Sequence, residues 1–430
     1  MVTRLQAPPY DALAPHLPKI GGADSDTARA VRAILDDVRA GGDAAVREHT
    51  RRLDGVDLPP GDWEVPAARW QQALERIPRP LRGALELAVQ RVRDYHANQA
   101  DEGFLERDAD GTEIGMRVVP LDRVGLYVPG GKAAYPSTVI MNAVPAVVAG
   151  VAEIVMVTPP TDAGAAPDVV LAAARLAGVD RVFRIGGAQA IAALAYGTPT
   201  IPRVDKIVGP GNRFVTEAKR QVAGFVGIDG LAGPSELAIV ADGDVDPRIA
   251  ALDLIAQAEH DPEARTFFLT PDAALAEKVG ASLEHEVEQA GRRDIVDLAL
   301  RHTKLVLVRD LDHAAAAVND IAAEHVLLLV DDPRALLPKV RNAGAIFLGS
   351  WSAVSFGDYG IASNHVLPTA GTARFSSGLR AADYVTVSSV IQMSPEAALG
   401  FSAGASALAR AEGLVGHAKA MDARAVEAGR

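Results

Sequence analysis

Short apolar runs, many of them rich in β-branched residues, alternate with alanine-rich helical segments along most of the chain after Val118. Strand-like runs at 124–128, 153–158 and 181–185 are each followed by a segment with helical periodicity. Strands that alternate with helices are typical of a parallel sheet with helices on both faces. The chain is therefore predicted to be an α/β protein.

The alternation occurs in two series, which predicts two Rossmann-like α/β units with parallel sheets plus helical N-terminal and C-terminal extensions. The boundary between the series is expected near 231–234, and the second series includes a helix expected over 333–343. The length of 430 residues suits two or three domains. The predicted parts are an N-terminal arm (1–20), a first α/β domain (21–123 with 232–380), a second α/β domain (124–231) and a C-terminal helical tail (381–430).

Charge and composition exclude several classes of partner. The formal net charge is -12, so the chain has no general basic footprint for nucleic acid or an anionic membrane. No apolar run is long and uniform enough for a membrane span. Pro8, Pro9 and Pro15 stand where a signal peptide would need an apolar core, so a cytoplasmic location is expected.

The chain contains no cysteine. This excludes disulfides, thiolate metal sites, iron–sulfur clusters and a cysteine nucleophile. A metal would have to be held by histidine, carboxylate or amide groups, and an aldehyde would have to be oxidised without a thiohemiacetal.

The segment 253–260 reads as the end of a helix expected over 247–260. Asp246 is a good N-cap, and Pro247 stands at the first helical position, where its missing N–H costs nothing. Gln257 and His260 are one turn apart, so an amide oxygen and an imidazole nitrogen can face one point, which suits zinc if other ligands arrive. Such a pair near a helix end is more often only a solvated face.

Three predicted strands end in glycine turns that carry a polar residue. Tyr127 precedes one turn, Gln189 follows the second and Asn212 follows the third. Ligands of open parallel sheets bind at the carboxyl ends of strands, where glycines let backbone N–H groups approach an anion. Phe214 stands where the dinucleotide fingerprint wants a third glycine, and no ribose-binding acid stands at the usual distance. A nucleotide and plain tight turns both remain open.

Glu324-His325 stands where a helix gives way to a buried strand, and the pair could accept protons. A histidine that stabilises a helix C-terminus is an equal alternative. Asp358 and His365 lie in a long glycine-interrupted segment (350–380), where a carboxylate is more often a turn-former. Glu412 and His417 lie in the C-terminal tail, where solvent exposure is the simple alternative.

Together these residues resemble histidinol dehydrogenases. The motifs occur in the order of that family from about residue 20 to the end of the chain. They are 124–131, 186–195, 206–212, 232–236, 257–260, 324–325, 357–359 and 364–369. Gly360 stands where some relatives have a cysteine, and its presence in a chain without thiols suggests that such a cysteine is dispensable.

The resemblance implies one Zn2+ per subunit, held by Gln257, His260, Asp358 and His417. It implies that Glu324 and His325 are catalytic and that Tyr127, Gln189 and Asn212 contact NAD. The binding site for the substrate L-histidinol would be lined by Ser235, Gln257, His260, His325, Asp358, His365, Glu412 and His417. It also implies a homodimer with shared active sites, in which the C-terminal tail supplies Glu412 and His417 to the partner.

The reaction implied is the NAD-dependent four-electron oxidation of L-histidinol to L-histidine through bound histidinaldehyde, the last steps of histidine biosynthesis. His325 would accept the alcohol proton, and Glu324 would activate water to give a gem-diol. Zinc would chiefly orient the substrate. Three other readings stay open: a zinc hydrolase or deaminase, a non-catalytic two-lobed binding protein, and a dehydrogenase of another amino alcohol or sulfonate.

Overall fold

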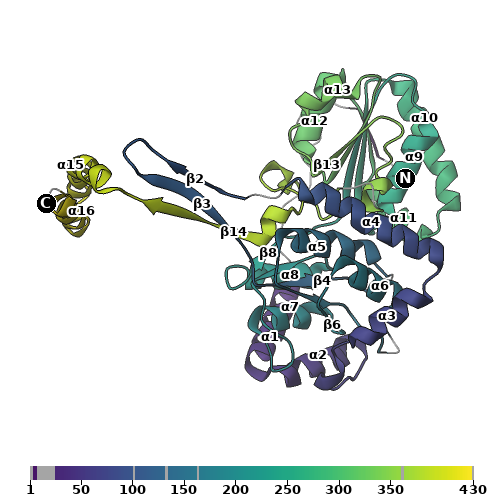
Figure 1. Cartoon of the computed structure of the whole chain (residues 1–430). Helices are drawn as coiled ribbons and strands as arrows, with labels where there is room; N and C mark the ends of the chain where they lie inside the picture. The colour runs from purple at the N-terminus through teal and green to yellow at the C-terminus, as the bar shows by residue number, and fades with distance from the viewer. Residues whose placement is uncertain are drawn as a thin grey trace. The chain divides into compact units, whose positions relative to one another are not determined.

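The computed structural model describes residues 3–6, 25–99, 102–130, 134–161, 164–359 and 363–428. It divides into a larger compact unit (Met1–Gln99 with Asp122–Tyr384) and a smaller one (Ala100–Leu121 with Val385–Arg430). The larger unit contains two parallel sheets, each covered by helices (Figure 1). Most of the predicted arm at 1–20 lies outside the described residues, and the remainder forms a strand of one of these sheets.

The first sheet of the larger unit has five parallel strands in the order β6-β5-β4-β7-β8. Its strands are β4 (Arg123–Tyr127), β5 (Glu153–Val157), β6 (Arg181–Phe183), β7 (Lys206–Val208) and β8 (Gly227–Ile228). One helical layer contains α3 (Ala67–Arg76), α4 (Arg79–Ala97), α5 (Pro136–Ala149) and α6 (Asp168–Ala177). The other contains α1 (Ser25–Gly41), α2 (Asp43–Asp54), α7 (Gly187–Tyr196) and α8 (Arg213–Val222), and a short turn η3 (Pro60–Asp62) joins α2 to α3.

The second sheet has six parallel strands in the order β1-β11-β10-β9-β12-β13. Its strands are β1 (Thr3–Gln6), β9 (Glu236–Ala241), β10 (Arg265–Thr270), β11 (Lys304–Leu307), β12 (His325–Leu329) and β13 (Ala345–Leu348). Helices α9 (Pro247–Ala258), α10 (Ala273–Glu286) and α11 (Arg293–Ala299) pack together, and α12 (Leu311–Ile321) packs with α13 (Pro333–Leu336). Short turns complete this part: η4 (Val287–Gln289), η5 (Leu300–His302), η6 (Leu337–Lys339), α14 (Ser355–Asp358), η7 (Thr372–Arg374) and η8 (Ala381–Tyr384).

Alternate residues of the central strands pack into two separate cores of the six-stranded sheet. Leu327 and Leu329 join the core beneath α9 and α10, whereas Val326 and Leu328 join the core beneath α12. A strand buried on both faces reads as a continuous apolar run, which is why 326–330 was recognisable in the sequence. Apart from β1, both sheets share one strand order, in which the first strand lies at the centre and the fourth beside it, as in doubly wound folds.

The smaller unit combines a three-stranded antiparallel sheet with two helices. The sheet has the order β14-β3-β2 and contains β2 (Phe104–Arg107), β3 (Glu113–Pro120) and β14 (Val385–Gln392). The helices α15 (Pro395–Ala411) and α16 (Val415–Ala428) pack on each other, and the Ser402 hydroxyl donates to the Met421 carbonyl at 3.0 Å.

Two elements differ from the sequence predictions. The helix expected over 333–343 is wrong: α13 ends at Leu336, because Pro338 cannot donate the hydrogen bond that would continue the helix. The range 381–430, predicted as helical, begins with the turn η8 and the strand β14. The domain boundaries stay a prediction, although α1, α2 and α3 pack on helices of the five-stranded sheet rather than on the six-stranded one.

Candidate active site

A cavity of about 1950 Å³ opens within the larger unit, between its two sheets. Tyr127, Gln189 and Asn212 reach it from the carboxyl ends of the five-stranded sheet. Ser235, Glu324 and His325 reach it from the amino ends of β9 and β12. The five-stranded sheet therefore meets the cavity with the carboxyl ends of its strands, and the six-stranded sheet meets it with the amino ends of its strands. The general rule that ligands bind at carboxyl ends describes only the first of these walls.

The turns before α7 and α8 form one wall of the cavity. The Tyr127 hydroxyl accepts a hydrogen bond from the Gly187 N–H at 3.1 Å, and burial raises the pKa of Tyr127 to about 12, so the phenol stays protonated. The Gln189 side-chain amide donates to the Asp54 carboxylate at 3.0 Å. The buried Gln189 Oε1 has no hydrogen-bond partner among the described residues.

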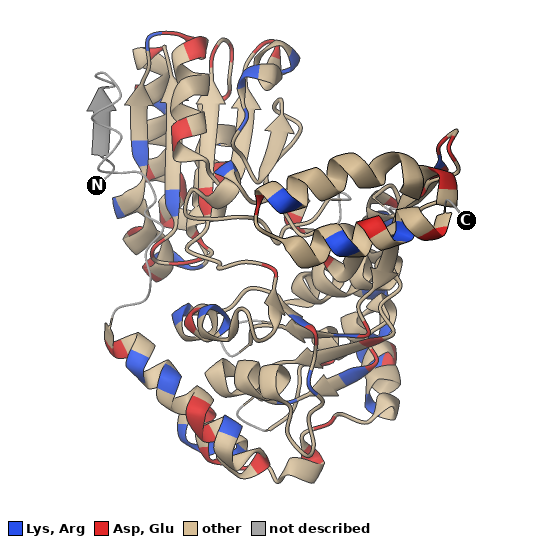
Figure 2. Ribbon diagram, turned by 90° about the vertical axis from the view of Figure 1, so that its left-hand side faces the viewer, with Lys and Arg blue, Asp and Glu red and all other residues tan. Residues whose placement is uncertain are grey.

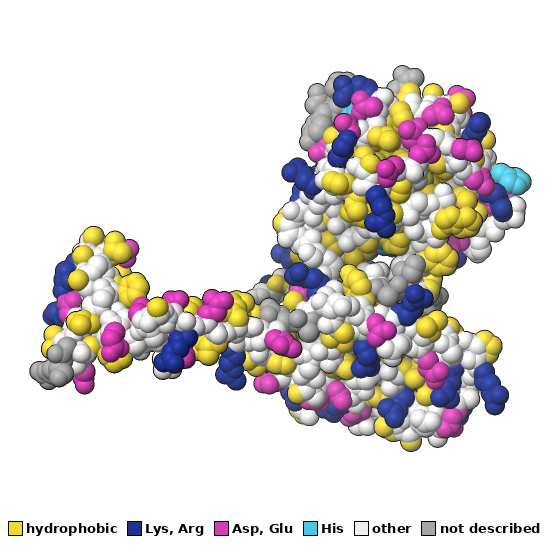
Figure 3. All heavy atoms as spheres, turned by 45° about the horizontal axis from the view of Figure 1, so that its top comes forward, with side chains coloured by type: hydrophobic (Ala, Val, Ile, Leu, Met, Phe, Trp, Pro, Cys, Tyr) yellow, Lys and Arg dark blue, Asp and Glu magenta, His cyan; other side chains and the backbone are white. Residues whose placement is uncertain are grey.

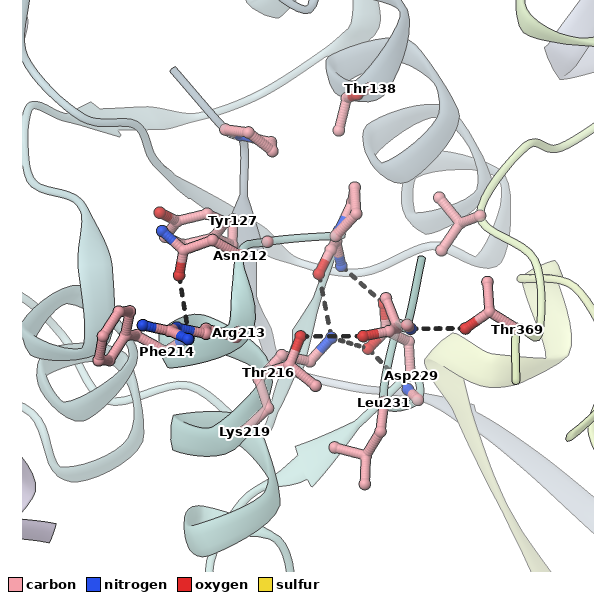
Figure 4. Close-up of a pocket in the computed structure, with 18 of the residues that line it drawn as sticks. Tyr127, Thr138, Asn212, Arg213, Phe214, Thr216, Lys219, Asp229, Leu231 and Thr369 are labelled. Carbon is pink, nitrogen blue, oxygen red and sulfur yellow. Dashed lines mark hydrogen bonds and ion pairs between the residues drawn. The ribbon is translucent and has the colours of Figure 1, made fainter. Parts of the chain in front are cut away.

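Asn212 begins α8 as its N-cap. Its side-chain oxygen accepts from the N–H groups of Phe214 at 3.0 Å and Val215 at 3.2 Å, which fixes the helix start beside the cavity (Figure 4). Behind this start, the Lys219 ammonium forms a buried ion pair with Asp229. The second Asp229 oxygen accepts from the Gly209 N–H at 2.7 Å, so the pair also holds the glycine turn.

On the opposite wall, the backbone of Glu236 contacts both Glu324 and His325. The Glu236 N–H donates to Glu324 Oε2 at 3.1 Å. The Glu236 carbonyl lies 3.3 Å from His325 Nδ1, and Glu324 Oε2 lies 3.6 Å from the same nitrogen. Two acceptors around Nδ1 favour the tautomer that carries its hydrogen there, so Nε2 keeps a lone pair for a proton.

Burial dominates the acid–base properties of this wall. Burial lowers the pKa of His325 to about 4, despite the nearby Asp358 carboxylate, so its imidazole is neutral at pH 7. Burial raises the pKa of Glu324 well above its usual value, against hydrogen bonds from the Glu236 N–H and the Ser235 side chain. Perturbed acids and bases that face a cavity are typical of catalytic sites.

Asp358 gathers two further histidines. Its Oδ2 lies 3.8 Å from His260 Nε2, and its Oδ1 lies 3.3 Å from His365 Nδ1. Burial opposes the ionised form of Asp358, but the His365 hydrogen bond and the charges of the nearby histidines hold its pKa below the usual value. An ionised carboxylate between imidazoles is a donor set that suits zinc.

Gln257 lies in the last turn of α9, three residues before His260, and unlike His260 it does not line the cavity. It is 4% exposed, and its amide nitrogen has no hydrogen-bond partner among the described residues. The unpartnered atom is a donor, so it can receive a hydrogen-bond acceptor, whereas only the amide oxygen of Gln257 could bind a cation. Two ligands of one zinc stand about 3–4 Å apart, so the separation of Asp358 from His260 fits a shared ion. Even so, no group of three or more His, Asp or Glu side chains close enough to hold a metal occurs within the described ranges.

The two remaining predicted residues belong to the smaller unit. Glu412 ends α15 and His417 lies in the first turn of α16, and both are exposed. Their predicted place in the substrate site stays a prediction. Gly131, which belongs to a quoted motif, and Gly360, which directly follows one, lie outside the described residues.

Sequence reasoning missed four residues around the cavity: Asp54, Lys219, Asp229 and Glu236. Lys219 and Asp229 are ten residues apart and pair only because α8 returns beside β8. Glu236 lies in the quoted motif 232–236, but its contacts with Glu324 and His325 use main-chain atoms, which the motif did not indicate. Asp54 comes from α2, about seventy residues before the first glycine turn, and no local signal links it to Gln189.

Comparisons with known proteins agree on one family. The sequence model described as histidinol dehydrogenase matches residues 20–425. The chain is 51% identical over 403 residues to a histidinol dehydrogenase of Nitrosospira multiformis, covering 93% of this chain and 91% of the relative. It is 50% identical over 407 residues to that of Pseudomonas aeruginosa, covering 94% and 92%.

A solved structure is similar over the whole chain. The crystal structure of histidinol dehydrogenase from Elizabethkingia anophelis superposes with a TM-score of 0.95 at 30% identity, covering 100% of this chain and 99% of that one. None of the helices in the described part of the chain is long and apolar enough to span a membrane.

Proposed function

Because this chain belongs to the histidinol dehydrogenase family, we propose that it oxidises L-histidinol to L-histidine in histidine biosynthesis, with NAD as the oxidant. The observation that carries the proposal is a neutral, buried His325 with a free Nε2, beside Glu324 and across one cavity from the glycine turns. A proton acceptor opposite a nucleotide site is what oxidation of an alcohol by hydride transfer requires.

The NAD site would use Tyr127, Gln189 and Asn212. Gln189 lies in the first turn of α7, Asn212 is the N-cap of α8, and the Tyr127 hydroxyl contacts the first residue of α7, so the positive ends of both helix dipoles point to where phosphate would bind. Bound NAD would accept one hydride in each of the two oxidation steps, which accounts for the four electrons.

The metal site would use Gln257, His260 and Asp358 of one subunit and His417 of its partner. A zinc ion bound there would orient the imidazole and amino groups of histidinol. Support comes from the separation of 3.8 Å between Asp358 Oδ2 and His260 Nε2. His365 would line the substrate site on the other oxygen of Asp358, with Ser235 beside Glu324.

His325 would accept the proton of the substrate hydroxyl at Nε2. Its Nδ1–H stays on the Glu236 carbonyl, so the imidazolium that forms is stabilised by that carbonyl and by Glu324. The lowered pKa of His325 keeps its imidazole neutral before the reaction. In the second oxidation His325 would accept a proton from the hydrate of the aldehyde in the same way.

Glu324 would take a proton from the water that adds to the bound aldehyde. The hydrate then forms with one new C–O bond, and the carbonyl oxygen gains a proton. A raised pKa suits a carboxyl group that must take and return protons near neutral pH. The chain has no cysteine, so a thiohemiacetal cannot replace the hydrate.

A homodimer is the proposed assembly. Both faces of the sheet formed by β2, β3 and β14 carry exposed apolar side chains, among them Leu105 and Ile391. Leu408 on α15 is 71% exposed. Figure 3 shows hydrophobic side chains gathered on the part of the chain that carries α15 and α16. A small sheet with two exposed faces is marginally stable in water, so a covering partner is expected.

The test separates the two proton acceptors. His325→Asn should lower both alcohol oxidation and aldehyde oxidation by roughly 10²–10⁴-fold. Glu324→Gln should slow the step from histidinaldehyde to histidine much more than the step from histidinol to the aldehyde. The measurement is the reduction of NAD by histidinol and, separately, by histidinaldehyde. His285→Asn, which changes an exposed histidine of α10, is the control.

The outcomes are distinct. If Glu324→Gln slows both steps equally, the proposal that Glu324 takes a proton from the attacking water is wrong. If the wild type reduces no NAD with histidinol, the proposed reaction is wrong, and a hydrolytic reaction at the same acid–imidazole pair becomes the next to test.

A further inference from the structure

Nucleotide-binding sheets of this strand order usually carry an acid at the end of the second strand, where it meets the adenosine ribose of NAD. In this chain that strand is β5, which ends at Val157 and is followed by Thr158, Pro159 and Pro160. Pro159 and Pro160 line the cavity. The usual acid is therefore absent from its usual place, and a carboxylate for the ribose would have to come from another element.

Asp54 enters the same cavity from α2. It is the last residue of that helix, which ends because Gly55 adopts a left-handed conformation with φ 71°. Helix α2 packs on α7, and the Asp54 carboxylate accepts from the Gln189 side chain at 3.0 Å. One carboxylate oxygen is thus engaged with a residue of the proposed NAD site.

Asp54 has no cation beside it among the described residues. Two nearby acids are each paired with an arginine: Glu48 with Arg51 at 2.8 Å and Asp57 with Arg47 at 2.6 Å. Among the described residues, Asp54 has only the neutral Gln189 amide as a hydrogen-bond partner. Burial raises its pKa to about 6, and its place at a helix C-terminus is also unfavourable for a negative charge.

No described cation of the protein balances the charge of the Asp54 carboxylate, so its position beside the cavity suggests that a ligand does. The neutral hydroxyl groups of a ribose are suitable donors to an ionised carboxylate. Two arginines of α2 are paired with carboxylates, Arg47 with Asp57 and Arg51 with Glu48, so their charges are not left to balance a phosphate. Arg52 donates to His49 Nδ1 at 3.0 Å.

The position of α2 indicates which end of the coenzyme it would meet. Figures 1 and 2 show α1 and α2 on the side of the five-stranded sheet that faces away from the six-stranded sheet. The nicotinamide must approach His325 at the six-stranded sheet, so the adenosine end would lie toward α2.

We propose that Asp54 accepts the hydroxyl groups of the adenosine ribose and is the residue that selects NAD over NADP. This inference rests on the proposed function only in taking NAD as the coenzyme. A 2′-phosphate in place of the hydroxyl would remove the donor and bring a second negative charge against Asp54. Gln189 holds the carboxylate in the orientation that receives the hydroxyl groups.

The experiment measures coenzyme binding directly. NADH and NADPH are titrated into the purified full chain, without histidinol, and binding is followed by the fluorescence of the reduced nicotinamide. The wild type should bind NADH about tenfold or more tightly than NADPH. Asp54→Asn should weaken NADH binding and shrink the ratio of the two dissociation constants by about tenfold, since the charge is lost while an amide still reaches Gln189.

Glu75→Gln is the matched control. Glu75 lies on α3 and also accepts from a glutamine side chain, that of Gln71 at 2.9 Å, but it is exposed and does not line the cavity. Its replacement removes the same charge and should leave both dissociation constants within about twofold. A general effect of net charge on coenzyme binding would change both variants alike and would overturn the proposal.

Other outcomes are equally decisive. Equal binding of NADH and NADPH by the wild type overturns the proposal without any variant. So does an unchanged ratio in Asp54→Asn or, if that variant does not fold, in Asp54→Ser. Reduction of NAD by histidinol is measured separately on the wild type, so a failure of the proposed reaction would not be mistaken for a failure of the role of Asp54.

Discussion

Gly209 is the residue whose conformation most constrains the turn between β7 and α8. Its φ is +110°, and a Cβ built on it would lie 2.2 Å from the backbone oxygen of Tyr127. No ordinary side chain fits that contact, because the atom it meets belongs to the backbone of β4 and cannot swing away. The close approach of β7 to β4 at this point also fixes the distance between Tyr127 and Asn212.

We expect Gly209→Ala to lower the free energy of unfolding by about 3 kcal/mol or more, from the unfavourable φ and the clash together. Gly230→Ala is the control, since a Cβ there meets nothing within 4 Å and should change stability by less than about 0.5 kcal/mol. Urea unfolding of both variants measures the difference. Equal stability of the two variants would show that the turn relaxes freely.

At the scale of elements, the site depends on how α9 meets the loop that carries Asp358. Asp253 lies on α9 one turn before Gln257 and is 6% exposed. Burial raises its pKa from 3.8 to about 6, although a hydrogen bond with the backbone of Val354, directly before α14, acts in the opposite direction. The acid therefore ties the helix of Gln257 to the short helix that ends at Asp358.

The sign of the pH effect follows from that shift. The folded chain holds the Asp253 proton more tightly than the unfolded chain, so this contribution to stability is full below about pH 3.8 and is lost as the pH rises through about 6. A shift of about two units corresponds to about 3 kcal/mol. Asp253→Asn has no such titration.

We therefore expect the stability of Asp253→Asn relative to the wild type to rise by about 2–3 kcal/mol between pH 4 and pH 7.5. Urea unfolding at several pH values measures it, with Glu75→Gln as the control for the loss of one carboxylate. A difference that stays constant across this range would contradict the raised pKa.

Elements with local signals were predictable from the sequence, and elements without them were not. The helix start at Asp246 and Pro247 is confirmed: the Asp246 side chain accepts from the Arg248 N–H at 2.9 Å. Such a cap depends on neighbours in the chain. The strand β14 was missed because its partner β3 lies about 270 residues away and neither face of the pair is buried in a way that produces an apolar alternation.

The residues of the candidate site also divide into those with a local sequence signal and those without one. Tyr127, Gln189 and Asn212 were found because glycine turns mark the ends of strands, and all three line the cavity. Asp54 could not be found, since only the packing of α2 on α7 brings it to Gln189. The roles of these residues toward NAD, zinc and histidinol remain proposals.

At the scale of the whole molecule, acidic and basic side chains are interspersed along the helices of the larger unit (Figure 2), whereas the smaller unit exposes apolar residues. The proposed homodimer would cover these residues and bring Glu412 and His417 to the partner's cavity. Each complete site would then contain His325 from one subunit and His417 from the other.

This arrangement predicts complementation. Inactive His325→Asn and His417→Asn chains, unfolded together and refolded, should recover about a quarter of the wild-type activity, because half of the dimers are mixed and one of their two sites is intact. A mixture of His325→Asn with Glu324→Gln is the control, since both changes lie in the same wall and every site stays damaged. No recovery in the first mixture would contradict a shared site.

The contacts that Glu236 makes through its peptide groups have a consequence for how the enzyme tolerates mutation. The N–H that holds Glu324 and the carbonyl that receives His325 are present whatever amino acid follows Ser235, apart from the N–H that proline lacks. A side-chain replacement at this position leaves both backbone contacts in place. A one-residue insertion or deletion between Pro234 and β9 would instead shift the N–H and the carbonyl away from Glu324 and His325 at the same time. The positions of Glu324 and His325 are thus more robust to substitution of Glu236 than to any change in the length of the chain in front of it.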